Sequence, residues 1–315
     1  MPVGAPTLVV VGDLDQATPA ELATLTRLPV IVAARSPAGP AAARAVDVVV
    51  DDEAALEQTR RGCERAPIAA TAAALLLRSP TADWWEGLVR ESATYSMLQG
   101  GEEFQRWHRA RGTRTGLGDA HPRVRVERHG ATTEVTLTRP ERHNALDAQT
   151  RDELHAALAE ATTGSGPVVL LGAGPSFCSG GDLDEFGTFP DPASAHLLRL
   201  TRSVAAIIAA AADRFVVGLH GACLGAGVEL PAFAGHVVAA DDARVGLPEL
   251  GLGLVPGAGG TVSLPARIGR HRTFELLALD GTISASAARE WGLVDELVPR
   301  TRLRSRCLEI AESLS

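Results

Sequence analysis

The stretch GACLGAGVELPAFAG, from Gly221 to Gly235, places a single carboxylate, Glu229, within a run of small and apolar residues. Burying an ionised carboxylate without a partner is costly, so such a group shifts its pKa or pairs with another group. A second carboxylate, Glu249, lies in the next glycine-rich stretch, LPELGLGLVPGAGG (Leu247–Gly260). Two carboxylates brought to one place indicate paired general acid–base work.

Three glycine-rich stretches, of which FCSGGDLD (Phe177–Asp184) is the first, each follow a predicted strand. Backbone N–H groups in such loops are not shielded by side chains, and two of them aimed at one point form an oxyanion hole for a carbonyl or enolate oxygen. The stretch around Glu229 is predicted to open a helix, with Glu229 on its first turn. The positive end of that helix favours a negative charge at the same place.

The surrounding pattern predicts an α/β fold. Alternation on both sides of Gly130 predicts a β-hairpin over residues 124–138. Asp147 is the expected N-cap of a helix that reaches about Ala161. Buried strands are expected at residues 167–174, 215–221 and 235–242, and a long helix at residues 192–211. Strands that alternate with helices in this way favour a largely parallel sheet.

The N-terminal region has a different organisation. Strands are expected at residues 6–15 and 28–34, followed by an amphipathic helical stretch at residues 81–112. Residues 111–122, RGTRTGLGDAHP, are predicted to be a linker. We therefore divide the chain into an extension, residues 1–115, and a core, residues 116–315.

Composition excludes several classes of protein. The net charge is −8, which argues against non-specific nucleic-acid binding, and the 315 residues include no lysine, which removes lysine Schiff-base chemistry and a P-loop. The four cysteines form no CxxC pair, so metal-site spacing is lacking and a reducing cytoplasm is the expected compartment. The longest apolar stretch, residues 203–221, contains Asp213 and Arg214, so it predicts a buried helix and strand rather than a membrane span.

Four segments, taken in order, resemble the signature segments of the crotonase (enoyl-CoA hydratase/isomerase) superfamily. They are RPERHNALD, FCSGGDL, LHGACLGAGVEL and LPELGLGLVPGAGGT, and the resemblance covers roughly Val124 to Val298. It implies a crotonase-like ββα superhelix core and an enzyme that binds acyl-CoA thioesters and stabilises a thioester enolate. Enoyl-CoA hydratases carry two glutamates, which match Glu229 and Glu249, so the resemblance is closest to them.

The resemblance also implies roles for individual residues. By position, the oxyanion-hole N–H groups fall on Gly181 and Ala226. A water molecule would sit between Glu229 and Glu249, of which one removes a proton and the other holds the water or protonates Cα. The implied substrate-binding positions are Arg142, Ala145, Asp182, Leu183, Asp184 and Gly257. No metal or cofactor is expected beyond the CoA of the substrate, and the expected assembly is a homotrimer or hexamer without nucleic-acid or membrane partners.

Other interpretations stay open. An enoyl-CoA Δ-isomerase, or another enolate-forming acyl-CoA lyase, needs only one of the glutamates. A ClpP-like hydrolase of related fold would use Ser179, His220 and Asp182, which lie near the same loops. A non-catalytic assembly partner is a further possibility. Asp182 is otherwise expected to cap a following helix, His220 to be structural, and the cysteines to be small core residues.

The resemblance departs from the family at the ends of the chain. Family members continue beyond GLVDELV with several helices, whereas in this chain residues 65–112, on the N-terminal side of the core, look like those helices. A loose internal echo joins residues 42–67 to residues 287–312. Together these features predict that the extension is a degenerate crotonase copy that supplies the terminal helices, although chance similarity also explains the echo.

Overall fold

The central element is a six-stranded sheet. The computed structural model describes residues 8–11, 17–34, 40–112, 121–189, 191–279 and 281–314. The strands of this sheet lie in the order β12-β9-β7-β6-β5-β4, and every neighbouring pair is parallel except the hairpin β4·β5. Their bounds are Val124–His129 (β4), Thr132–Leu137 (β5), Val168–Gly172 (β6), Phe215–Leu219 (β7), His236–Ala240 (β9) and Glu296–Val298 (β12). The predicted hairpin and buried parallel strands are confirmed.

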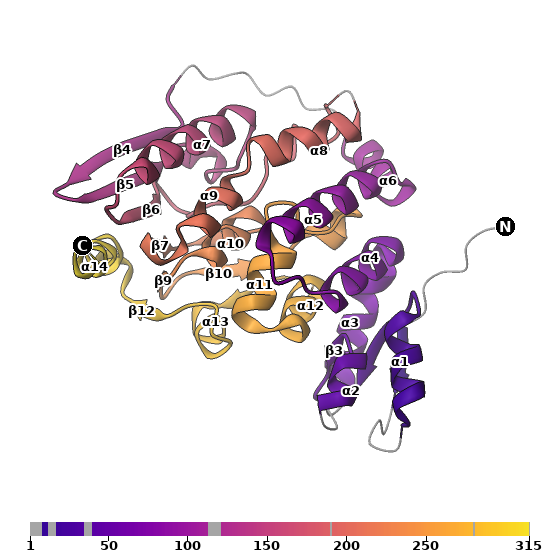
Figure 1. Cartoon of the computed structure of the whole chain (residues 1–315). Helices are drawn as coiled ribbons and strands as arrows, with labels where there is room; N and C mark the ends of the chain where they lie inside the picture. The colour runs from indigo at the N-terminus through magenta and orange to yellow at the C-terminus, as the bar shows by residue number, and fades with distance from the viewer. Residues whose placement is uncertain are drawn as a thin grey trace.

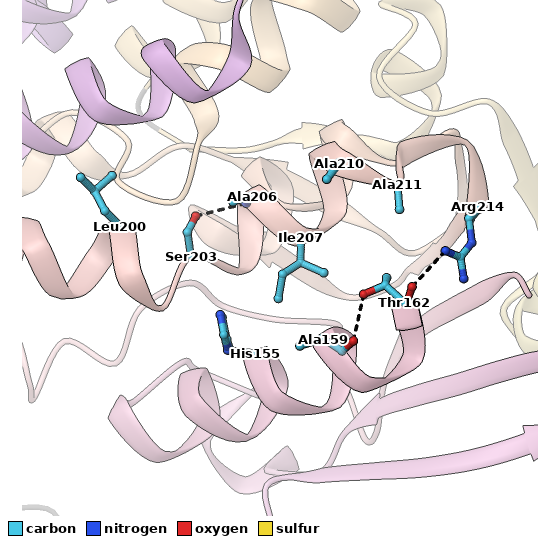
Figure 2. Close-up of a pocket in the computed structure, with 10 residues that line it drawn as sticks. All are labelled: His155, Ala159, Thr162, Leu200, Ser203, Ala206, Ile207, Ala210, Ala211 and Arg214. Atoms are coloured by element: carbon cyan, nitrogen blue, oxygen red, sulfur yellow. Dashed lines mark hydrogen bonds between the residues drawn. The ribbon is translucent and has the colours of Figure 1, made fainter. Parts of the chain in front are cut away.

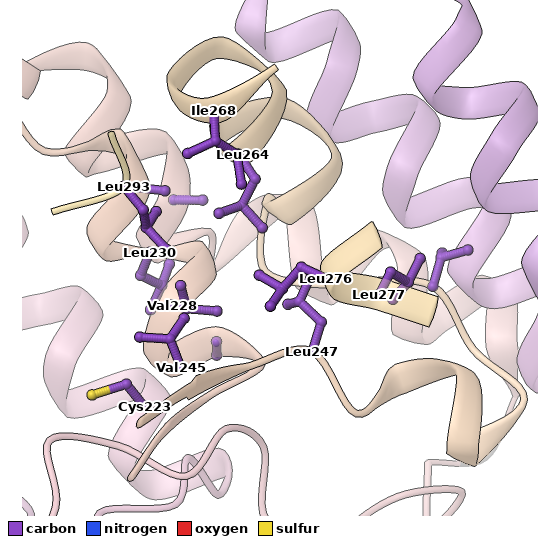
Figure 3. Close-up of a cluster of buried hydrophobic side chains, with 14 of the residues drawn as sticks. Cys223, Val228, Leu230, Val245, Leu247, Leu264, Ile268, Leu276, Leu277 and Leu293 are labelled. Carbon is purple, nitrogen blue, oxygen red and sulfur yellow. The ribbon is translucent and has the colours of Figure 1, made fainter. Parts of the chain in front are cut away.

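A smaller sheet has the order β11-β10-β8 and consists of Ile283–Ser284 (β11), Arg244–Gly246 (β10) and Ala222–Leu224 (β8). The chain passes from β7 of the large sheet to β8 of the small one, and then enters a helix. It passes again from β9 to β10 before the next helical segment. This repeated strand–strand–helix path is the ββα superhelix that the family resemblance implied. Apolar side chains fill the space around the small sheet, including Val228, Val245 and Leu264 (Figure 3).

Helices pack around these sheets (Figure 1). They are Ala148–Thr163 (α7), Pro192–Thr201 (α8), Val204–Ala210 (α9), Ala226–Glu229 (α10), Gly260–Ile268 (α11), Arg270–Ala278 (α12), Ala285–Glu290 (α13) and Leu303–Ser313 (α14). Short 3₁₀ turns lie at Pro140–Arg142 (η2), Ala212–Arg214 (η3), Pro231–Phe233 (η4), Glu249–Leu252 (η5) and Arg300–Arg302 (η6). As predicted, Asp147 caps α7, since its side chain accepts the N–H of Thr150 at 2.7 Å. None of the helices in the described ranges has the length and apolar character that crossing a bilayer requires.

Two predicted helices are each interrupted. The continuous helix expected at residues 192–211 is wrong, because Ser203 accepts the N–H of Ala206 at 3.1 Å and starts α9 as a separate helix. The stretch at residues 81–112 likewise forms two helices, which meet at Gly100 and Gly101. Both breaks arise from residues that favour helix ends over helix interiors.

The extension forms its own small α/β unit. A three-stranded parallel sheet contains Leu8–Val11 (β1), Ile31–Ala34 (β2) and Val48–Val49 (β3). The helices are Pro19–Arg27 (α1), Pro40–Ala45 (α2), Glu53–Arg65 (α3), Pro67–Arg78 (α4), Trp84–Gln99 (α5) and Glu102–Arg111 (α6). The predicted linker falls mostly on residues 113–120, which lie outside the described residues.

The extension packs directly on the core of the same chain (Figure 1). Helix α5 lies against α8 and α11, and α3 and α4 lie against α12. A buried ion pair joins Arg78 to Asp47, and Arg270 of α12 reaches the same carboxylate at 3.7 Å. The two echoing segments share the order helix, strand, helix, as α2-β3-α3 and as α13-β12-α14. A duplication stays a prediction.

Candidate active site

Glu229 is placed by a sharp turn between β8 and α10. Gly225 occupies this turn with φ of +50°, a conformation that side-chain-bearing residues rarely adopt. Its N–H donates to the Gly246 carbonyl at 3.0 Å, and its own carbonyl accepts the N–H of Glu229 at 2.9 Å. Helix α10 makes a single turn before Pro231 starts η4. Glu229 is thereby fixed on the first turn, as predicted, and is only 2% exposed.

The Glu229 carboxylate binds the start of α11. Its Oε2 accepts the N–H groups of Ala258 and Gly260 at 2.7 and 2.9 Å. A β-carbon on Gly260 would lie 2.7 Å from Cγ of Glu229, so only glycine fits there. Burial raises the pKa of Glu229 well above its ordinary value, and the neighbouring Glu249 raises it further, while the two N–H donors oppose the shift.

Glu249 faces Glu229 across Gly225. A β-carbon on Gly225 would lie 2.6 Å from Oε1 of Glu249 and 3.8 Å from Oε1 of Glu229, so both carboxylates point at one glycine. Burial raises the pKa of Glu249 to about 8. Its Oε2 is buried and, among the described residues, has no hydrogen-bond partner. Glu249 is therefore buried beside Glu229, as the sequence predicted, with one oxygen available to a proton or a water molecule.

The loop before Asp182 lies along the loop before α10. The Leu224 N–H donates to the Cys178 carbonyl at 3.0 Å, and a β-carbon on Gly180 would lie 2.9 Å from the Leu224 carbonyl oxygen. Across the residues that the structure describes, no hydrogen bond engages the N–H groups of Gly181 and Ala226. Both predicted oxyanion donors are therefore left free, on two loops that touch.

A third carboxylate, which sequence reasoning missed, enters this site from the extension. Glu91 of α5 is 1% exposed and accepts the N–H groups of Gly259 and Thr261, each at 2.7 Å. Burial raises its pKa to about 7. A signal existed: Glu91 falls at helical spacing between Leu88 and Tyr95, which mark the buried face of α5.

Ionisation of all three buried carboxylates is disfavoured, because the charge of Glu91 raises the pKa of Glu229 and of Glu249, and the charge of Glu249 raises that of Glu229 further. A cation lies beside one of them: the guanidinium carbon of Arg199 on α8 lies 4.6 Å from the ring centroid of Tyr95, and Arg199 donates to the Ser92 hydroxyl at 3.1 Å and lowers the pKa of Glu91. Burial outweighs this effect, so all three pKa values stay raised, which favours a mixture of protonated and ionised carboxyl groups near neutral pH. Mixed protonation is the state that an acid–base pair requires.

The predicted substrate-binding residues are only partly gathered at this site. Asp182 is 5% exposed and pairs with Arg139 at 2.8 Å and with Arg142 at 3.1 Å, while Asp184 pairs with Arg142 and, at 2.6 Å, with Arg111 of the extension. Asp182 accepts the Asp184 N–H at 3.1 Å and caps a turn. The prediction that Asp182 caps the next helix is therefore wrong, since α8 begins at residue 192, where it was expected, and its N-cap is Asp191.

The remaining predicted substrate-binding positions lie on either side of this cluster. Ala145 is buried, with its carbonyl bound to Arg139 at 3.2 Å, and Leu183 is half-buried. Gly257 is half-buried against the ring of Tyr95, which a β-carbon there would approach to 2.6 Å. Gly257 thus borders the carboxylate cluster, whereas Ala145 belongs to the arginine–aspartate network.

The hydrolase arrangement is not formed in the described part of the chain. His220 is bound to the Gly174 carbonyl at 3.2 Å, and its pKa is lowered to about 4 by burial and then by Arg300. Asp182 is bound to arginines, so neither residue orients Ser179 as a nucleophile.

The cysteines are all free and buried, as expected of small core residues. A groove between α7 and α9, whose lining includes His155 and Arg214 (Figure 2), has none of the three carboxylates among its lining residues.

The superhelix and its buried carboxylates define an enzyme of crotonase type. A sequence model of the enoyl-CoA hydratase/isomerase family matches residues 127–315, and the chain belongs to that family. Its sequence is 31% identical over 196 residues to "Probable enoyl-CoA hydratase echA8" of Mycobacterium tuberculosis, a match that spans 61% of this chain and 75% of that protein.

Solved structures of enoyl-CoA hydratases have the same fold as the core of this chain. The enoyl-CoA hydratase of Thermoplasma volcanium superposes with a TM-score of 0.57 at 31% identity, over 62% of this chain and 77% of that one. The enoyl-CoA hydratase of Bacillus anthracis superposes with a TM-score of 0.57 at 32% identity, over 61% of this chain and 76% of that one. The fold expected from the sequence resemblance is thereby confirmed.

Proposed function

We propose that the protein hydrates 2-enoyl-CoA thioesters, with Glu229 and Glu249 as the acid–base pair. The observation that carries the proposal is the pair itself: two buried carboxylates point at Gly225, and the pKa of each is raised by burial. Groups whose pKa values lie near the working pH transfer protons most effectively. The family membership supports the same reaction class.

Hydration of the enoyl thioester requires two proton transfers. The oxygen of a water molecule attacks Cβ while one carboxylate, in its ionised form, accepts a water proton. The electron pair of the double bond moves toward the thioester oxygen, where the N–H groups of Gly181 and Ala226 would receive the negative charge. The second carboxyl group, in its protonated form, then delivers a proton to Cα. The product is a 3-hydroxyacyl thioester, and no cofactor is consumed because CoA arrives with the substrate.

The two glutamates differ in their hydrogen bonds, and the difference favours different roles. Glu229 receives two N–H donors, which favour its ionised form, whereas Glu249 has a buried oxygen without a partner among the described residues. This asymmetry favours Glu229 as the base and Glu249 as the acid. We also propose, from the family resemblance alone, that the chain assembles as a trimer or a dimer of trimers, and, from its scattered cysteines, that it lies in the cytoplasm.

The proposal is tested by following the enoyl-thioester absorbance with crotonyl-CoA and with a longer or aromatic enoyl-CoA. Wild-type protein should deplete the band, and Glu249→Gln should lower kcat by about 100-fold or more, since a general acid–base residue contributes about 10²–10⁴-fold. An isomerase that uses one glutamate would keep its activity on a 3-enoyl-CoA in one of the single variants Glu229→Gln and Glu249→Gln. If wild-type protein leaves every enoyl-CoA unchanged, the hydratase proposal is wrong.

A further inference from the structure

The segment that holds Glu229 is itself held by the extension. Segment 258–261 presents four consecutive backbone N–H groups at the start of α11. The first and third donate to Glu229, and the second and fourth donate to Glu91. The Thr261 hydroxyl adds a further donor to Glu91 at 2.7 Å. Two buried carboxylates thus bind alternate peptide groups of one short segment, although Glu91 precedes Gly259 by 168 residues.

Helix α5 is fixed against this segment by packing on both sides of Glu91. A β-carbon on Gly259 would lie 3.1 Å from Cδ2 of Leu88, and the ring of Tyr95 covers Gly257. From α8, Arg199 binds the Ser92 and Ser96 hydroxyls of α5. The carboxylate of Glu91 therefore has a defined position, which a surface side chain would not have.

We propose that Glu91 is a positioning residue: its carboxylate fixes segment 258–261 so that the N–H groups of Ala258 and Gly260 meet Glu229. The inference rests on the proposed hydratase function and assigns the extension a part in it. A carboxylate that accepts backbone N–H groups at a helix start forms charge-assisted hydrogen bonds, which are stronger than neutral ones. When Glu91 no longer holds its two N–H groups, the segment relaxes and Glu229 loses the donors that favour its ionised form.

The variant Glu91→Asp tests this directly, because it keeps the carboxyl group but shortens the side chain by one methylene. Glu103→Asp is the matched control: Glu103 lies on α6 and caps another helix of the extension, where it accepts the N–H groups of Ile68 and Ala69 at 2.8 and 3.0 Å. Each variant removes one methylene group, but only Glu91 contacts segment 258–261.

The measurement is the pH profile of kcat and kcat/KM. In Glu91→Asp, kcat should fall by about 10- to 100-fold, the range seen when partners that orient metal ligands are removed, while KM stays within about threefold. The acid limb of kcat/KM should move to higher pH, because the pKa of Glu229 rises when its donors are lost. If the variant only reduced the amount of folded protein, the measured rate would fall but the acid limb of kcat/KM would stay at the same pH. The titratable and charged groups that face this interface are Tyr95, His196, Arg199, Glu229 and Glu249.

Two further measurements keep the inference open to refutation. If Glu91→Asp fails to fold, Thr261→Val takes its place as the test, because it removes only the hydroxyl donor to Glu91. It should lower kcat by about 2- to 10-fold, which corresponds to the loss of one hydrogen bond. Hydrogen exchange of the peptide that covers segment 258–261 should be faster in Glu91→Asp than in Glu103→Asp. If both aspartate variants share one profile and one exchange rate, Glu91 does not position the segment. If wild-type protein hydrates nothing but the exchange differs, the hydratase proposal fails and the positioning role stands.

Discussion

At the scale of single residues, the burial of Glu249 that suits it to proton transfer also lowers the stability of the folded protein as the pH rises. Its pKa is about 8 in the folded protein against 4.5 for an ordinary glutamate, because burial disfavours the charged form. Between these values the folded protein keeps a proton that the unfolded chain has released. Stability is therefore highest below the unfolded pKa and falls as the pH rises toward the folded pKa.

The variant Glu249→Gln removes this dependence. At pH 5 the glutamate and the glutamine are both neutral in the folded protein, so their melting temperatures should be close. At pH 8 the variant should melt at the higher temperature, because only the wild type has a carboxylate to keep protonated or to bury ionised. Thermal unfolding at both pH values measures the difference. The substitution Glu312→Gln, at an exposed position, controls for the loss of one negative charge. A wild type that melts higher at pH 8 would contradict the assignment of Glu249 as a buried acid.

The sequence predicted part of the residue-scale site. Glu229 and Glu249 were predictable because each lies beside glycines in stretches with a distinctive pattern, and the structure places both against Gly225. Glu91 was not identified, because its stretch reads as an ordinary amphipathic helix. Its partners, Gly259 and Thr261, lie so far along the chain that only the packing of α5 on α11 brings them to it.

At the scale of elements, the break between α8 and α9 depends on one hydroxyl. Ser203 caps α9 by accepting the N–H of Ala206 at 3.1 Å. Replacement of a serine N-cap by alanine typically costs about 1 kcal/mol. We expect Ser203→Ala to lower the free energy of unfolding by about that amount, as measured by urea denaturation. Ser203→Asp keeps a cap acceptor and should retain most of the stability. Equal loss in both variants would show that the cap does not hold the break.

The same break explains why element boundaries were predicted less well than element types. Residues 192–211 are apolar enough throughout to suggest one helix, and serine is a weak signal by itself. The parallel strands were easier to predict, because β6, β7 and β9 are continuous runs of buried apolar residues between turn-forming residues.

At the scale of the whole molecule, the extension and the core share one buried interface. Leu88 and Tyr95 of α5 cover glycines at the start of α11, and Glu91 binds the backbone between them. Deletion of residues 1–115 should expose this apolar surface and leave the first turn of α11 without its carboxylate partner. We expect the truncated chain to be insoluble or to lose the proposed oligomeric state, which size-exclusion chromatography of the soluble fraction measures.

A soluble, active core would show that the extension is dispensable. A truncated chain that is soluble but has lost hydration, while Glu91→Asp is fully active, would separate a general role in folding from the positioning of Glu229. The full-length protein, purified alongside, provides the reference for solubility and assembly. Both comparisons depend on the same contact surface, because α5 is the helix that lies against both α8 and α11.

The sequence by itself determined the class of fold, the hairpin and parallel strands, and the two carboxylates of the core, because these follow from local periodicity and from glycine-rich motifs. The tertiary structure alone decided that α5 covers the site from within the same chain, and that Glu91 shares the α11 N–H groups with Glu229. It also decided that Asp182 pairs with Arg139. Burial and proximity between distant segments set these outcomes, and no local pattern of residues encodes them.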